Sequence, residues 1–126
     1  MSQIRLKGMP LLKVHYACEL KKELLNSLST LLSKSIADIL GKSEDFVMII
    51  FQKTELQSFG NDAEGINLYF EMKNVGVLPP DKTSLLTSII TNLCQELIEV
   101  KSNRIYIEFQ ESERHHWGWN GQTFCK

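Results

Sequence analysis

An internal repeat is the feature that most restricts how this chain can fold. Residues 42–52 read KSEDFVMIIFQ, and residues 101–110 read KSNRIYIEFQ. Both segments open with Lys-Ser, continue with β-branched and aromatic residues, and close on Phe-Gln. Each also follows a stretch whose apolar residues recur at helical spacing. Self-similarity of this kind indicates a duplicated unit of about 60 residues.

The first unit predicts a strand, a helix and a second strand. Residues 11–17 are expected to form a strand that is partly covered on both faces. From about residue 20 to residue 40, leucines and isoleucines fall at three- and four-residue steps, which is typical of one stripe of an amphipathic helix. Gly41 stands where a helix C-cap belongs, and residues 46–52 are expected to form the second strand.

The second unit repeats this plan. We expect a strand over residues 66–72, ended by Leu78-Pro79-Pro80. Asp81 or Thr83 can cap the helix that follows, and a strand over residues 104–110 completes the unit.

The predicted fold class is therefore α+β, with two tandem βαβ units. They give a four-stranded sheet with two helices on one face, and right-handed crossovers make the two strands of each unit parallel neighbours. The other face is expected to expose Val14, Phe51, Leu68 and Phe70 or their register mates. Exposed apolar surface of this extent usually marks an oligomer contact, and a closed ring would cover identical faces.

Composition excludes several classes of function. A chain of 126 residues is expected to form one domain, and its formal net charge of −1 does not favour a nucleic-acid partner. No apolar stretch is long enough to span a bilayer, and no signal peptide is evident. The three cysteines lack CxxC spacing, which indicates reduced thiols in the cytoplasm and neither a metal site nor a cofactor.

The Met9-Pro10 pair decides what chemistry the chain can carry. A proline at the start of a protein is a secondary amine, whereas a proline inside a chain is a tertiary amide without a basic nitrogen. Residues 1–9 are interpreted as an extension that is a trimmed leader, a mis-assigned start or a cloning remnant, and residues 10–126 as the domain. If Pro10 becomes the first residue, a base stands at the edge of the first strand.

The C-terminal segment Trp117-Gly118-Trp119-Asn120-Gly121-Gln122-Thr123-Phe124 belongs to neither repeat. Its aromatic residues have two interpretations. They can pin the terminus to the body of the protein or to a neighbouring subunit, or they can wall an apolar pocket that binds a planar ligand.

Several of these features together resemble the tautomerase superfamily. They are Pro10 before the first strand, two βαβ units, Gly41-Lys42 after the first helix, Arg104-Ile105-Tyr106-Ile107 in the last strand, and Gly118-Trp119-Asn120 with Thr123-Phe124 at the end. The branch of macrophage migration inhibitory factor (MIF) and D-dopachrome tautomerase is the most similar.

The resemblance implies a homotrimer with active sites between subunits and an N-terminal proline as catalytic base. Such enzymes move a proton between carbon and oxygen in keto–enol substrates such as phenylpyruvate or dopachrome analogues. Pro10 then matches the base, and Lys42 matches the cation that meets the substrate's carboxylate or carbonyl oxygen. The matching substrate-binding positions are Met72, Tyr106 from across the interface, and the pocket walls Trp119, Phe124 and Phe46.

Two residues depart from the family pattern. Glu108 stands where a neutral asparagine is common, which would put a carboxylate close to an anionic substrate. The stretch Glu64-Gly65-Ile66-Asn67 stands where the cytokine-type member has a CxxC motif, so thiol oxidoreductase activity is not expected.

The residues suit proton transfer, and each also has a plainer interpretation. A free α-amino group has a pKa of about 7.7–8.0, and an apolar pocket with a neighbouring ammonium would lower it. Lys42, however, could simply complement a helix dipole, and Tyr106 could belong to the core. Adjacent His115 and His116 are interpreted as a solvated loop pair. The alternative functions are a non-catalytic, MIF-like trimeric binding or cytokine-like protein, exported without a signal peptide, and a ligand-binding domain with a ferredoxin-like sheet.

Overall fold

The computed structural model describes residues 9–124 and follows the predicted repeat. The first unit comprises β1 (Leu11–Tyr16), α2 (Lys22–Leu40) and β2 (Met48–Lys53). The second unit comprises β3 (Leu68–Val75), α3 (Pro80–Ile98) and β4 (Ile105–Ser112). The short 3-10 turns η1 (Glu44–Phe46) and η2 (Ser102–Arg104) precede β2 and β4, and the chain ends in η3 (Arg114–His116), β5 (Gly118–Trp119) and β6 (Gln122–Thr123).

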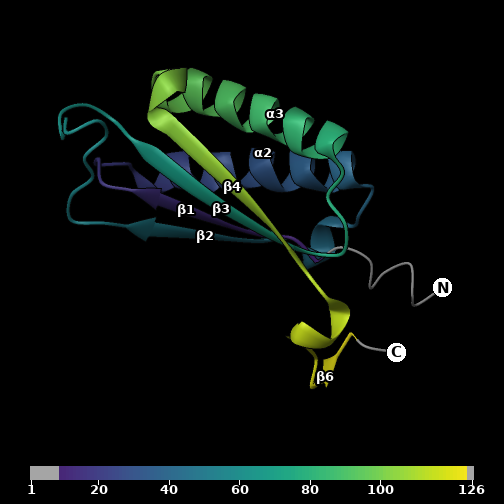
Figure 1. Cartoon of the computed structure of the whole chain (residues 1–126). Coiled ribbons are helices and arrows are strands. Elements are labelled where there is room, and N and C mark those ends of the chain that lie inside the picture. Colours follow the sequence, from purple (N-terminus) through teal and green to yellow (C-terminus); the bar gives the residue numbers. More distant parts are fainter. Residues whose placement is uncertain (1–8, 125–126) are drawn as a thin grey trace.

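The sheet has the strand order β2-β1-β3-β4. β1 and β2 are parallel, as are β3 and β4, and the two units meet where β1 pairs with β3 in antiparallel fashion, with Leu11 opposite Lys73. Both helices cover the same face of the sheet, and the chain after β4 extends beyond the end of the sheet (Figure 1). The two tandem βαβ units predicted from the sequence are thus confirmed.

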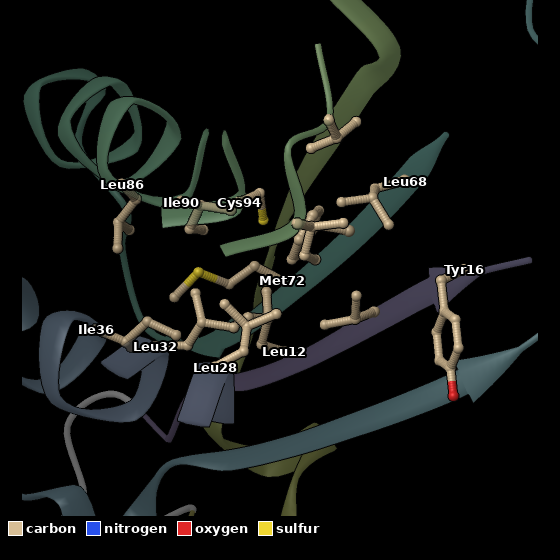
Figure 2. Packing of buried hydrophobic residues seen from close by; sticks show 14 of the residues in the cluster. Leu12, Tyr16, Leu28, Leu32, Ile36, Leu68, Met72, Leu86, Ile90 and Cys94 are labelled. Carbon is tan, nitrogen blue, oxygen red and sulfur yellow. The ribbon is translucent and has the colours of Figure 1, made fainter. Parts of the chain in front are cut away.

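The hydrophobic core lies between the sheet and the helices. Alternate residues of β1 are buried, which is the period expected of a strand with one face on a core. Figure 2 shows Leu12 and Met72 of the central strands close to Leu28 and Leu32 of α2, with Ile90 of α3 above them. The side chain of Met72 is 0% exposed.

The uncovered face of the sheet differs from the prediction. Val14, Leu68 and Phe70 belong to the core beneath the helices, and Phe51 pairs with Val14 on that same side. The register mates that face away from the helices are largely polar, so the face is not the broad apolar surface from which we expected an oligomer contact.

Hydrogen bonds link the polar residues of this uncovered face across its strands. The Nε2 of His15 donates to the carboxylate of Glu71, and the hydroxyl of Tyr69 donates to Glu108. The His15 ring also stacks on Tyr69, with 5.1 Å between ring centroids. The hydrogen bond that Tyr69 donates to Glu108 raises the pKa of Tyr69 to about 12, because a carboxylate acceptor favours the protonated phenol.

The ends of the helices show one confirmed and one wrong prediction. Gly41 closes α2 in the left-handed conformation, with φ of 67°, as predicted. α3 instead begins at Pro80 with Pro79 as its N-cap, so Asp81 and Thr83 lie inside the helix. Proline suits the first helical position because its φ is already helical and the missing N–H has no partner there.

The two helix ends generate a paired prediction. Gly41 and Glu99 both have a positive φ, of 67° and 63°, which is unstrained for glycine and strained for other residues. A β-carbon at Gly41 would contact nothing within 4 Å, so backbone strain alone decides the effect of a substitution there. Gly41→Ala should lower the free energy of unfolding by about 1 kcal/mol, and Glu99→Gly should raise it by up to about 1 kcal/mol. Urea denaturation measures both, and changes of the same sign would contradict the assignment.

A second prediction concerns the core position Met72. Truncation there leaves a cavity, so Met72→Ala should lower the free energy of unfolding by about 2–5 kcal/mol. Val77 is an apolar residue that is 76% exposed, and Val77→Ala should change the same quantity by less than about 0.5 kcal/mol. Equal effects of the two truncations would show that Met72 is not a core residue.

Candidate active site

A cavity of about 300 Å³ opens at the end of the sheet where β1 begins. It collects residues from the start of β1, from the segment before β2 and from the C-terminal hairpin. They include Pro10, Phe46, Met48, Trp117, Trp119 and Phe124. Three segments that are distant in the sequence therefore meet here, and the lining is mainly apolar and aromatic.

Pro10 is held firmly at this cavity. The residue is less than 2% exposed, and its carbonyl oxygen accepts a hydrogen bond of 3.1 Å from the N–H of Met48. This bond extends the β1–β2 pairing by one step beyond Leu11. In the chain as it stands, the nitrogen of Pro10 is bonded to the carbonyl carbon of Met9 and carries no basic lone pair.

The aromatic wall is built by the segment after β4. The N–H of Phe124 donates to the carbonyl oxygens of Arg114 and Trp117, both at 3.2 Å, and the Nε of Arg114 donates to the carbonyl oxygen of Phe124 at 3.0 Å. Asn120 and Gly121, at φ of 54° and 82°, make the tight turn between β5 and β6. These contacts fix Phe124 in a buried position and leave Trp119 half exposed at the cavity.

The predicted aromatic residues contact one another. The Trp119 ring stacks on Phe124 with 6.3 Å between centroids, and Phe46 meets Trp119 edge-to-face at 5.4 Å. Phe124 therefore anchors the segment to the body of the protein, and Trp119 lines the cavity; binding of a planar ligand there stays a prediction.

A small second core lies behind the cavity, and sequence analysis missed one member of it. Met9, Val75 and Phe124 form this cluster, with Phe46 and Trp117 packed against it. Val75 ends β3, and the antiparallel register of β1 and β3 brings it to the level of Met9. The signal that could have found it is the strand register, which the single sequence did not fix.

The structure does not bring the remaining predicted residues to this cavity within one chain. Met72 is three residues before Val75 and points into the main core (Figure 2). Tyr106 and Glu108 lie on the uncovered face of the edge strand β4, where Tyr106 is 64% exposed and packs on Phe59 at 4.9 Å. Lys42 follows Gly41, is half buried, and donates its backbone N–H to the carbonyl of Ala37 at 2.8 Å.

Few charged groups approach the cavity. Asp45 of η1 is a lining residue, and its backbone N–H donates to the hydroxyl of Ser43 at 3.1 Å. Over residues 9–124, no group of three or more His, Cys, Asp or Glu side chains is arranged to hold a metal ion. Neither helix of the described chain is long and apolar enough to cross a membrane.

Comparison with known proteins gives consistent matches. The family model described as macrophage migration inhibitory factor (MIF) matches residues 9–125. The macrophage migration inhibitory factor of Xenopus laevis is 22% identical over 94 residues, which are 75% of this chain and 81% of that protein. A macrophage migration inhibitory factor homolog of Brugia malayi is 27% identical over 92 residues, or 73% and 79% of the two chains.

Solved structures agree with these matches. The macrophage migration inhibitory factor homologue of Prochlorococcus marinus superposes with a TM-score of 0.84 at 30% identity, covering 91% of this chain and 99% of that one. The Leishmania major MIF2 structure has a TM-score of 0.84 at 26% identity, covering 94% and 99%. With the family model spanning nearly the whole described chain and the fold shared, this protein belongs to the macrophage migration inhibitory factor family of the tautomerase superfamily.

Proposed function

We propose that the protein is a keto–enol tautomerase in which Pro10, once it is the first residue, acts as the general base. The observation that carries the proposal is the position of Pro10, a buried proline at an apolar, aromatic-lined cavity in a member of this family. Members of the superfamily are isomerases, and the substrate proposed here is of the phenylpyruvate or dopachrome type.

The surroundings of Pro10 suit a base that works near neutral pH. A free α-amino group starts at a pKa of about 7.7–8.0, and an efficient general base has a pKa close to the pH at which it operates. Enclosure by Phe46, Trp119 and Phe124 would disfavour the charged ammonium of a free Pro10 and so lower the pKa of its amine. The proline ring adds rigidity, so the nitrogen is held in place before the substrate arrives.

The proposed reaction moves one proton and leaves the composition of the substrate unchanged. Pro10 takes a proton from the carbon next to the carbonyl, the electron pair of that C–H bond forms the C=C bond as the carbonyl π pair moves onto the oxygen, and the protonated Pro10 returns the proton to that oxygen to give the enol. Lys42 lies outside the cavity lining, just after α2, and its long side chain would extend to that oxygen and stabilise the negative charge on it. Trp119 would stack on the aromatic ring of the substrate.

Association of subunits would bring Tyr106 and Glu108 to the active site. Both lie on the uncovered face of an edge strand rather than at the cavity of their own chain. We propose a homotrimer in which this strand approaches the cavity of the neighbouring subunit, so that Tyr106 adds a hydrogen bond and Glu108 alters specificity. In the same proposal Met72 would contact the substrate through its backbone, because its side chain packs in the core.

One observation favours a non-catalytic, MIF-like binding protein as the second candidate. Met9 is 5% exposed and packs against Val75 and Phe124, and its carbonyl acylates Pro10. A chain that keeps Met9 has no base at this position. The intact mass of the natural protein separates the two candidates: a mass beginning at Pro10 favours the enzyme, and one retaining Met9 favours the binding protein.

The first functional prediction tests the base. A preparation beginning at Pro10 should tautomerise phenylpyruvate, followed by ultraviolet absorbance of the enol, and the chain that retains residues 1–9 should be slower by at least about 100-fold because its nitrogen is an amide. Pro10→Gly in the processed chain should lose most of the activity, since a flexible primary amine replaces a fixed secondary one. Equal, slow rates for all three proteins would refute the enzyme.

The second functional prediction separates Lys42 as an electrophile from Lys42 as a helix-dipole partner. Lys42→Met in the chain beginning at Pro10 should lower kcat/KM by about 100-fold or more. Lys34→Met is a matched control, because Lys34 is exposed on α2, the helix that Lys42 follows, and its Nζ pairs with the Asp38 carboxylate at 3.9 Å. If both variants keep full activity, Lys42 serves only the helix end.

A further inference from the structure

We propose that Asn74 is a positioning residue for the free amine of Pro10. The side-chain oxygen of Asn74 would accept a hydrogen bond from the N–H of that amine. The inference rests on the proposed function, since it concerns the same base. It assigns a role to a residue outside both the sequence motifs and the cavity lining.

The pairing of β1 with β3 places the two residues opposite each other. Leu11 is opposite Lys73 in this antiparallel ladder, so one step further toward the cavity Pro10 faces Asn74. Opposite residues of an antiparallel pair share a face, and this pair shares the helix-covered face with Leu12 and Met72. Pro10 is less than 2% exposed and Asn74 is 3% exposed, so water has little access to either.

The side-chain oxygen of Asn74 lacks a donor. Its Nδ2 donates weakly to the carbonyl oxygen of Gly76 at 3.5 Å, which turns the Oδ1 atom the other way. That Oδ1 is buried and has no hydrogen-bond partner in the part of the chain the structure describes. Buried amide oxygens are nearly always partnered, so an unpartnered one needs an explanation.

The amide at Pro10 explains the missing donor. A proline nitrogen bonded to Met9 carries no hydrogen and can give Asn74 nothing. Once Met9 is removed, the neutral amine has one N–H and one lone pair, and the protonated amine has two N–H groups. The cleavage that creates the base therefore also gives Asn74, across the β1–β3 ladder, a hydrogen-bond donor.

The hydrogen bond would decide where the lone pair points. With the single N–H of the neutral amine held by Asn74, the lone pair is directed away from β3 and toward the cavity. After the base takes the substrate's proton, one N–H stays on Asn74 and the other carries the proton to be returned. Asn74 thus sets the orientation of the base without touching the substrate.

The neutral amide also keeps charge away from the base. Charged groups on the elements around this pair include Lys42 after α2, Asp45 of η1, Arg114 of η3 beside Phe124, and Glu111, which is opposite Asn74 on β4. The Glu111 carboxylate is engaged by the backbone N–H of Leu78 at 2.6 Å. A carboxylate at position 74 would favour the protonated amine, whereas the amide accepts a hydrogen bond without adding a charge.

The experiment titrates the amine directly. In protein beginning at ¹⁵N-labelled Pro10, the nitrogen chemical shift is followed against pH by NMR. Asn74→Asp should raise the pKa of the Pro10 amine by about one unit or more. Asn74→Leu should lower kcat for phenylpyruvate about 10-fold with KM little changed, and Asn74→Ser, which keeps a shorter acceptor, should recover part of it.

Asn67 provides the matched control. It is also buried, at 8% exposure, with an Nδ2 that donates to the Gln57 carbonyl at 3.5 Å and an unpartnered Oδ1, but it precedes β3 at the other end of the strand. Asn67→Leu should leave the Pro10 titration and kcat unchanged. An unmoved titration in Asn74→Asp, or an equal shift in an Asn67→Asp variant, would overturn the proposal.

The titration also keeps this inference separate from the proposed function. It needs no turnover, so an inactive protein beginning at Pro10 would refute the tautomerase while the role of Asn74 is still decided by the pKa. If Asn74→Leu fails to fold, Asn74→Asp and Asn74→Ser carry the test, because both keep a polar side chain at the position.

Discussion

The antiparallel contact between β1 and β3 is the interaction on which the rest of the structure depends. Each βαβ unit alone has a two-stranded sheet, which is too small to cover a helix and exposes both of its edges. Joining the units at β1 and β3 places both strands in the centre, where Leu12, Phe70 and Met72 pack beneath two helices at once. The same contact brings the start of β1 and the end of β3 together, and the cavity lies there.

The repeat and the helical stripes were sufficient to predict the layout. Alternation in residues 11–17 and the apolar spacing up to Leu40 are local signals, and the Lys-Ser to Phe-Gln repeat made the second unit a copy of the first. Gly41 was likewise readable, because few residues adopt a positive φ at a helix end. The C-terminal aromatics left two interpretations open, an anchor for the terminus or the wall of a pocket, because the segment belongs to neither repeat and its position depends on contacts distant in the sequence.

The details that were missed depend on register, which no local pattern determines. The strand predicted at residues 66–72 in fact spans Leu68–Val75, so Val75, which the prediction left outside the strand, ends it beside Met9. The alternation also did not tell which face of the sheet the helices cover: Val14 and Phe70 face the helices and are core residues, whereas polar side chains such as Glu71 line the uncovered face. The helix start at Pro80 was missed because a side-chain cap was sought where proline's own geometry suffices.

The polar character of the uncovered face changes what can hold the proposed trimer together. A face on which His15 bonds to Glu71 and Tyr69 bonds to Glu108 has little to gain from dry apolar contact. Three of the exposed apolar residues lie at the margins of this face, with Met48 and Trp119 around the cavity and Tyr106 on the edge strand β4. Assembly through strand edges and cavity rims would bury these groups and leave the polar face hydrated. Subunit contact and completion of the active site would then be one event, because the same side chains take part in both.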